Sequence, residues 1–177
     1  MRRKEEVAAT PDVADPLGAC SNATLRKAAR RLGKLYDDAL APSGLRATQY
    51  VLLIQIGALG TPTMAELAKS LLMDLSATRH SLGPLIRDRM VKLRVDTNDR
   101  RVKRVSLTAA GEARSAEAGQ LWRRAQDHFE RAFGSARAAR LREELSVVAS
   151  ATFEDALLSA GELRAEAPER TKAIRKM

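Results

Sequence analysis

The sequence contains one cysteine, Cys20, in 177 residues, and only two histidines, His80 and His128. A single cysteine excludes an intrachain disulfide, and this composition is typical of proteins in a reducing compartment. The two histidines and the cysteine lie far apart along the chain, without the spacing of a metal site. We therefore expect a cytoplasmic protein that holds no metal ion and no cofactor.

The sequence also lacks a long apolar run. The longest one extends from Tyr50 to Leu59, is interrupted by Gln55 and is too short to cross a bilayer. The N-terminal residues 1–6 are mostly charged and lack the apolar core of a signal peptide. We expect no membrane partner.

Enzyme signatures are absent as well. The sequence has no phosphate-binding glycine loop, no paired-carboxylate motif and no arrangement of a nucleophile with a base. Aromatic residues make up only 3% of the chain, whereas hydrophobic residues make up 45%. This composition favours helices packed through small and aliphatic side chains. Because the catalytic motifs are absent, we expect that the protein is not an enzyme.

Positive charge, by contrast, is plentiful and unevenly distributed. The chain has 31 Lys and Arg against 22 Asp and Glu, which gives a formal net charge of +9. The stretch 87–104 is especially basic, with Lys and Arg far outnumbering Asp and Glu. A balance this basic favours a polyanionic partner.

Two helices are predicted in the first third of the chain. Asp15-Pro16 supplies an N-cap and a proline at the first helical position, and Pro42-Ser43-Gly44 ends that helix. A second, largely buried helix is predicted over 49–59, with Thr48 as its N-cap and Gly60 as its stop.

Two more helices follow in the middle of the chain. Thr63 and Glu66 form a capping box at the start of a helix that ends near Leu71. Ser76 is the predicted N-cap of the next helix, which extends to Asp88.

Two short strands come next, over 91–95 and 102–107, around the arginine-rich turn 96–101. Helix, turn, helix and hairpin in this order predict a winged helix-turn-helix, a unit that inserts its second helix into the DNA major groove. The fold class is therefore mainly α with a small β-wing. The alternative without DNA binding is a solvated, charged hairpin on an unrelated protein.

The predicted DNA contacts lie at the start of the second helix of this unit and on the hairpin. Side chains at the helix start reach base edges or phosphates, and a cation at the wing tip can enter the minor groove. Asp99 is placed to orient a neighbouring guanidinium through a bidentate pair. The candidates are Ser76, Thr78, Arg79, His80, Ser81, Asp99, Arg100, Arg101 and Lys103.

The C-terminal part is predicted to be helical. Thr108 caps a long helix over 109–133, and Ser135 caps a last helix that extends to Leu158 or Leu163.

Five short motifs follow one another along the chain: Leu45-x-x-x-Gln49-x-x-x-Leu53, Met64-x-Glu66-Leu67-Ala68, Leu75-Ser76-x-Thr78-Arg79, Asp99-x-Arg101, and Val105-x-Leu107-Thr108-x-x-Gly111. Together they resemble the MarR family of bacterial winged-helix regulators, over roughly residues 20–160. The resemblance implies a homodimer in which the first and last helices interlock and each lobe reads half of a pseudo-palindromic operator. It also implies a repressor that releases DNA when a small aromatic or amphipathic effector binds, or, in some members, when a cysteine is oxidised.

This resemblance suggests a domain organisation. It comprises a flexible arm over 1–14, a helical dimerisation region over 15–44 and 109–163, a winged helix-turn-helix DNA-binding lobe over 45–108, and a charged tail over 164–177.

The sequence departs from the family pattern at two positions. Arg89-Met90 follows the second helix where the family usually has a glycine, so a left-handed stop there costs roughly 1 kcal/mol of strain. Pro84 removes one hydrogen bond inside the same helix and is expected to kink it.

Other residues admit two readings. Cys20, at the start of the first helix, is either a redox switch or a small, inert buried residue. The basic side of the first helix, from Arg26 to Arg31, is either solvated or binds an acidic ligand or phosphates. A ligand pocket or ordinary packing would each account for Tyr36, Arg46, Tyr50, Trp122 and His128.

Three functions remain open at this point. The leading one is a sequence-specific DNA-binding transcriptional regulator, a homodimeric repressor released by an effector or oxidant. The alternatives are a non-specific architectural DNA-binding protein, which would have no preferred operator, and a winged helix used only for protein contacts.

Overall fold

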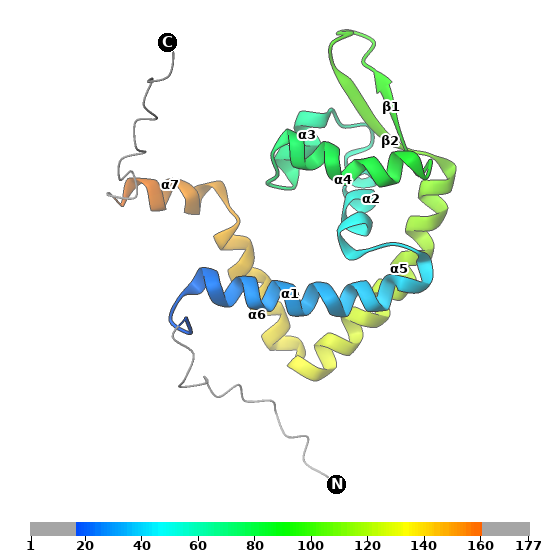
Figure 1. Ribbon diagram of the computed structural model, residues 1–177. Helices are drawn as coiled ribbons and strands as arrows, with labels where there is room; N and C mark the ends of the chain where they lie inside the picture. The colour runs from blue at the N-terminus through cyan, green and yellow to red at the C-terminus, as the bar shows by residue number, and fades with distance from the viewer. Residues whose placement is uncertain (1–16, 161–177) are drawn as a thin grey trace, which may run out of the picture. The chain divides into compact units, whose positions relative to one another are not determined.

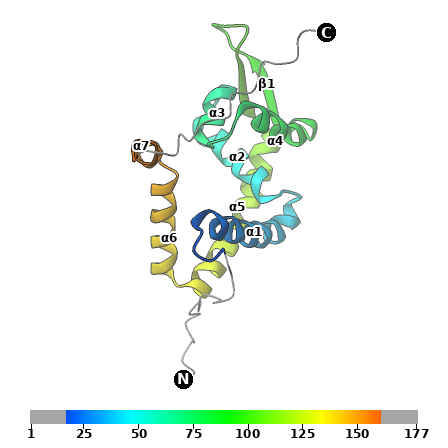
Figure 2. The same cartoon turned by 60° about the vertical axis from the view of Figure 1, so that its left-hand side comes forward.

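The computed structural model describes residues 17–160. These residues form two compact units, 17–129 and 130–160 (Figures 1 and 2). The described part of the chain is mainly helical and contains one two-stranded antiparallel sheet, which confirms the predicted fold class. Within residues 17–160, no helix is both long and apolar enough to cross a membrane.

The first helix, α1, spans Ser21–Leu40. It begins later than the predicted start at Pro16, which lies outside the described residues, and its N-cap is Cys20. The helix ends in the short 3₁₀ turn η1, Ala41–Ser43, and Gly44 follows with a φ of 72°. Glycine adopts this left-handed conformation without steric cost, so the predicted stop is confirmed.

Helix α2, Ala47–Leu59, supplies much of the core of the first unit. Its N-cap is Arg46 rather than Thr48, and the Gln49 side chain accepts a hydrogen bond from the Arg46 backbone N–H at 2.9 Å. The large, fully buried apolar side chains of this core come from six elements, α2 included: Leu40, Leu53, Ile56, Leu67, Leu82, Leu85, Val91 and Val105.

Helices α3, Met64–Ser70, and α4, Leu75–Arg87, form the helix-turn-helix. The predicted capping box is present: Thr63 N–H donates to the Glu66 carboxylate at 2.7 Å, and Glu66 N–H donates to the Thr63 hydroxyl at 3.1 Å. The predicted cap Ser76 is wrong, because the Asp74 carboxylate accepts from Ala77 N–H at 2.6 Å. A carboxylate two residues earlier therefore caps α4 and leaves Ser76 inside the helix.

Pro84 lies inside α4, and the helix continues past it to Arg87. Asp88 N–H still donates to the Pro84 carbonyl at 2.9 Å, so the last turn is intact. The ring removes the N–H that would bond to the carbonyl of exposed His80, where solvent can replace it.

The hairpin consists of β1, Val91–Val95, and β2, Lys103–Leu107, paired from Val91 opposite Leu107 to Val95 opposite Lys103. It is joined to the helix-turn-helix at its base, where Val105 N–H donates to the Pro62 carbonyl at 2.8 Å. The hairpin therefore extends the loop before α3, and its tip projects from the unit (Figure 1).

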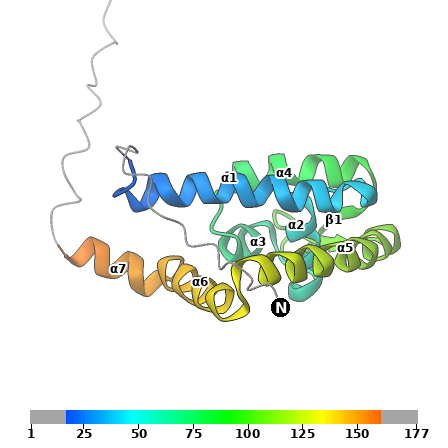
Figure 3. The same cartoon turned by 90° about the horizontal axis from the view of Figure 1, so that it is seen from below.

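Helix α5, Ala109–Phe133, follows Thr108, which caps it as predicted. The Thr108 hydroxyl accepts from Gly111 N–H at 3.1 Å and donates to the Arg89 carbonyl at 2.7 Å. A Cβ on Gly111 would lie 2.1 Å from the Met90 carbonyl oxygen. Only glycine permits this approach between α5 and the turn after α4. Seen from below, α1 and α5 both run along this unit (Figure 3). The Tyr36 hydroxyl on α1 donates to the Gln126 side-chain oxygen on α5 at 2.5 Å.

The second unit contains α6, Ser135–Val148, and α7, Ala151–Ser159. The prediction of one last helix is wrong, because the Ser150 hydroxyl accepts from Phe153 N–H at 3.2 Å and caps a separate helix. The cap of α6 is Gly134, with a φ of 92°, and not Ser135. Of the described residues in α6 and α7, only Ala138 is buried.

Arg89 has a φ of 57°, so the strained left-handed stop that the sequence predicted is present. We expect Arg89→Gly to raise the free energy of unfolding by about 1 kcal/mol, because glycine adopts this conformation without Cβ strain. Chemical denaturation measures the change.

The matched control is Arg87→Gly, the same substitution at an exposed position in the last turn of α4. Glycine there is expected to lower stability by roughly 0.5–1 kcal/mol. Equal destabilisation by the two substitutions would contradict the role of backbone strain.

Candidate nucleic-acid interface

The start of α4 presents polar side chains to solvent. Ser76, Arg79 and His80 are exposed, and Ser81 is half-buried. Thr78 differs, because it is completely buried and its hydroxyl donates to the Asp74 carbonyl at 2.8 Å. Thr78 therefore stabilises the first turn of the helix, and we remove it from the predicted DNA contacts.

A hollow of about 520 Å³ separates α4 from the hairpin. Its lining includes Arg79 from α4, Arg101 and Lys103 from the hairpin, and apolar side chains of Met64, Leu75 and Leu93. The fold thus brings three candidate cations from distant parts of the sequence onto one concave surface. A concave, cationic surface next to an exposed helix start is suited to the sugar-phosphate backbone of a duplex.

The tip of the hairpin holds one arginine in a fixed orientation. Arg101 donates from Nε and from a terminal nitrogen to the two carboxylate oxygens of Asp99, at 3.1 Å each. The same carboxylate accepts from the Arg101 backbone N–H at 2.9 Å. These hydrogen bonds, the side-chain one above all, lower the pKa of Asp99, so it stays ionised at neutral pH. Arg100 is exposed beside this pair.

Two further residues, Asp96 and Arg104, set the shape of the hairpin. The buried Asp96 carboxylate accepts from the backbone N–H groups of Asn98, at 2.8 Å, and Asp99, at 3.1 Å. It also accepts from Nε of Arg104, whose other nitrogen donates to the Thr61 carbonyl at 2.9 Å. One ion pair therefore connects the tip, the second strand and the loop before α3.

The electrostatics of this pair favour the charged forms. The hydrogen bond from Arg104, with smaller contributions from the N–H groups of Asn98 and Asp99, lowers the pKa of the Asp96 carboxyl. The same contact raises the pKa of Arg104.

The five candidate ligand residues do not form one site. The rings of Tyr50 and Trp122 lie 6.4 Å apart at 35°, on α2 and α5. Tyr36 is bonded to Gln126, whereas Arg46 is at the start of α2 and His128 is exposed near the end of α5. Of the five, only Tyr50 lines a groove of about 430 Å³ between α2 and α5.

The groove also contains Arg123, which the sequence did not single out. A Cβ on Gly119 would lie 3.4 Å from the Tyr50 hydroxyl oxygen and 3.7 Å from a guanidinium nitrogen of Arg123. Both polar groups thus lie beside the same glycine. Burial raises the pKa of Tyr50, and the positive charge of Arg123 opposes that shift.

Cys20 is exposed, which contradicts the reading that it is a buried residue. Its Sγ accepts a weak hydrogen bond from Ala23 N–H at 3.5 Å and caps α1. Among residues 17–160, no group of three or more His, Cys, Asp or Glu side chains is arranged to hold a metal ion.

Solved structures share this arrangement. The DNA complex of the transcriptional regulator MosR from M. tuberculosis is 33% identical in sequence, covers 81% of this chain and 99% of MosR, and has a TM-score of 0.68. A mutant of MarR from E. coli in complex with operator DNA is 24% identical, covers 76% of this chain and 99% of its own, and has a TM-score of 0.69.

The chain belongs to the MarR family. It is a DNA-binding transcriptional regulator and not an enzyme. BpsR from Bordetella bronchiseptica, 21% identical over 73% of this chain and 98% of its own, shares the fold with a TM-score of 0.65. No protein-family model matches the sequence, and no curated protein matches it.

In this MarR-family protein, sequence patterns pointed to the exposed wing residues but not to Asp96 and Arg104. An aspartate at the start of a turn, two residues before Asn98, is a signal for side-chain bonding to the following N–H groups. No local pattern indicates that Arg104 reaches Thr61, which precedes it by a whole helix-turn-helix.

We expect Asp96→Asn to weaken DNA binding by about fivefold to tenfold, because the hairpin loses its pre-formed shape. The measurement is a fluorescence titration with duplex DNA, together with amide hydrogen exchange of Asn98 and Asp99, which should become faster. In the wild type, this protection should persist at pH values above the usual aspartate pKa of about 3.9. Because the pKa of folded Asp96 is lowered, protection should be lost only as the pH falls through that lower value.

Asp88→Asn is the control, since it removes the same charge from an exposed residue paired with Arg87 at 3.6 Å. Its effect on DNA binding should be less than about twofold, in line with the small energies of exposed pairs. If both variants bound DNA equally well, Asp96 would have no positioning role.

Proposed function

We propose that this regulator is a homodimeric repressor that binds a pseudo-palindromic operator through the start of α4 and the hairpin. The observation that carries this proposal is the common surface of Arg79, Arg101 and Lys103 beside an exposed helix start. In this proposal α4 enters the major groove and the hairpin follows the backbone into the adjacent minor groove.

The contacts at α4 are assigned to the exposed residues Ser76, Arg79 and His80, with Ser81 at the edge. An arginine near a helix start can bond a guanine edge or a phosphate, and hydroxyl groups bond phosphate oxygens. The positive end of the helix dipole also attracts a phosphate.

The contacts at the wing are assigned to Arg100, Arg101 and Lys103, with Asp99 as an orienting group. The Asp99 carboxylate fixes the Arg101 side chain before DNA arrives, so less conformational entropy is lost on binding. Arg100 is exposed, and we assign it the more adaptable of the two arginine contacts at the tip.

Exposed apolar side chains support a homodimer. On α1, Leu25 is 41% exposed and Leu35 is 40% exposed. The second unit exposes Leu145, Val147, Val148, Leu157 and Leu158, which its own short helices do not bury. Surfaces of this kind are covered in stable proteins, and a second copy related by two-fold symmetry would cover both and match a palindromic site.

The side chains that line the groove between α2 and α5 favour a small aromatic acid as the effector. Tyr50 and the apolar side of α2 suit a ring, and Arg123 suits a carboxylate. DNA binding of BpsR is regulated by such a molecule, 6-hydroxynicotinic acid. Oxidation of the exposed Cys20 is the alternative signal.

We expect 6-hydroxynicotinic acid, used as a probe of this chemistry, to weaken DNA binding of the wild type and to have about tenfold less potency against Arg123→Gln. DNA-binding titrations at increasing acid concentration measure this. Arg124→Gln, with the same charge change at an exposed neighbour, should respond like the wild type. If Arg123→Gln responded to the acid as the wild type does, the groove would not be the effector site.

Selection of genomic DNA fragments by the purified protein at near-physiological salt tests the function as a whole. We expect a pseudo-palindrome whose half-sites lie about one helical turn apart. Diffuse recovery from both reduced protein and Cys20→Ser protein would instead favour an architectural DNA-binding protein. No recovery of DNA at all would contradict the assigned function.

The selected operator also tests the wing. Arg101→Ala should weaken binding about tenfold and reduce the slope of log affinity against log salt by about 1, since one phosphate contact is lost. Arg124→Ala removes the same charge away from the hairpin and should leave affinity within about twofold. Unchanged affinity of Arg101→Ala would argue against a wing contact.

A further inference from the structure

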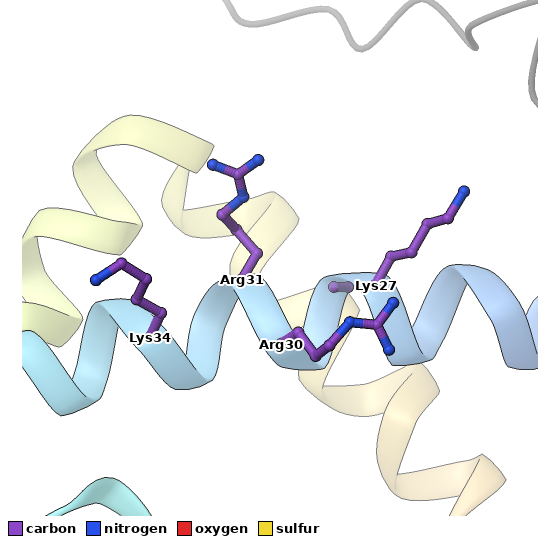
Figure 4. Close-up of a pocket in the computed structure, with 5 residues that line it drawn as sticks. Lys27, Arg30, Arg31 and Lys34 are labelled. Atoms are coloured by element: carbon purple, nitrogen blue, oxygen red, sulfur yellow. The ribbon is translucent and has the colours of Figure 1, made fainter.

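A second basic surface lies on α1, apart from the hairpin. Five cations occur from Arg26 to Lys34, and no aspartate or glutamate occurs from residue 17 to residue 36. Lys27, Arg30, Arg31 and Lys34, which we call the basic face, line a hollow along two turns of the helix (Figure 4). In Figure 4 the side chains of Lys27 and Arg31 extend to the same side of the helix.

Among residues 17–160, the two arginines of the basic face lack the nearby carboxylate that several other helical arginines of this chain have. Arg114 pairs with Glu117 at 3.2 Å and Arg140 with Glu144 at 3.8 Å, each within one turn of its own helix. On the basic face, Lys34 pairs with Asp38 at 3.0 Å, but Arg30 and Arg31 make no ion pair with any residue in 17–160.

The placement of these cations opposes helix stability. Lys27 and Arg31, like Arg30 and Lys34, are four residues apart, a spacing at which like charges repel. A bound anion would relieve this repulsion.

The basic face is separate from the proposed DNA surface. Lys27, Arg30 and Lys34 lie on the side of α1 opposite Leu32 and Tyr36, which are half-buried in the first unit. Figures 1 and 2 show α1 at the end of this unit that is farthest from the hairpin tip. A duplex held by α4 and the hairpin therefore leaves this surface open.

We propose that the basic face of α1 binds a small molecule that carries two or more phosphate groups. The guanidinium groups of Arg30 and Arg31 match phosphate oxygens in bidentate geometry, and the two lysines add point charges. From Lys27 to Lys34 the helix rises about 10 Å, so a chain of phosphates engages more of these cations than a single one does.

Calorimetric titration of the full chain with inorganic tripolyphosphate, without DNA and at physiological ionic strength, tests this site. We expect one saturable site per chain and weaker binding of orthophosphate. Arg30→Gln with Arg31→Gln should reduce tripolyphosphate affinity about tenfold or more, because two charge-assisted contacts are lost. The control double variant, Arg124→Gln with Arg131→Gln, loses the same charge from exposed positions of α5. Its tripolyphosphate affinity should stay within about twofold of the wild-type value.

Circular dichroism checks that both double variants keep the helical content of the wild type. If the variant with Arg30→Gln and Arg31→Gln does not fold, Arg31→Gln alone should still reduce tripolyphosphate affinity about threefold. The proposal is overturned by absence of saturable binding, or by equal losses in the two double variants.

Two other results would assign the surface to a different partner and also overturn the proposal. One is loss of operator affinity in the Arg30 and Arg31 double variant while tripolyphosphate does not bind the wild type, which would indicate DNA. The other is binding only to vesicles of anionic phospholipid, which would indicate a membrane surface. Since the titration contains no DNA, its failure would leave the operator selection unaffected.

Discussion

The hairpin keeps its direction because the chain bonds it to the loop before α3 at two points. Val105 N–H donates to the Pro62 carbonyl, and Arg104 links the Thr61 carbonyl to the Asp96 carboxylate. A free two-stranded hairpin is marginally stable in water, so these bonds turn it into an extension of the helix-turn-helix. Arg101 at the tip and Arg79 on α4 share a surface only while this connection holds.

A second constraint lies where α4, the hairpin and α5 meet. Arg89 takes a left-handed conformation, Thr108 bonds to the Arg89 carbonyl, and Gly111 lets α5 approach the Met90 backbone. The strain at Arg89 is tolerated because the packed surroundings determine the conformation of the turn. These contacts join the start of α5 to the base of the hairpin, and the same helix lines one side of the groove beside Tyr50.

The positive charge of the chain is divided between surfaces with different surroundings. On the hairpin, carboxylates of Asp96 and Asp99 hold two arginines in fixed orientations, which suits recognition of a regular duplex. On α1, Arg30 and Arg31 have no such carboxylate partners among residues 17–160. The surface on α1 therefore suits a small, flexible polyphosphate better than a regular duplex.

The sequence by itself determined the order of the elements, the capping box at Thr63, the stops at Gly44 and Gly60, and the membership of Asp99 and Arg101 in a wing. These features depend on helical periodicity, capping and turn chemistry within a few residues, which a sequence displays directly. The predicted caps at Thr48 and Ser76 each missed by two residues, because α2 and α4 begin earlier, after Arg46 and Asp74.

Only the tertiary structure decided that Thr78 is buried, that Asp96 and Arg104 support the wing, and that the aromatic and basic ligand candidates lie apart. Each of these facts depends on contacts between segments distant in sequence, such as Arg104 with Thr61 or Tyr50 with Trp122. Burial and long-range pairing follow from how complete helices pack, and the local pattern around one residue carries no information about the surface that will cover it.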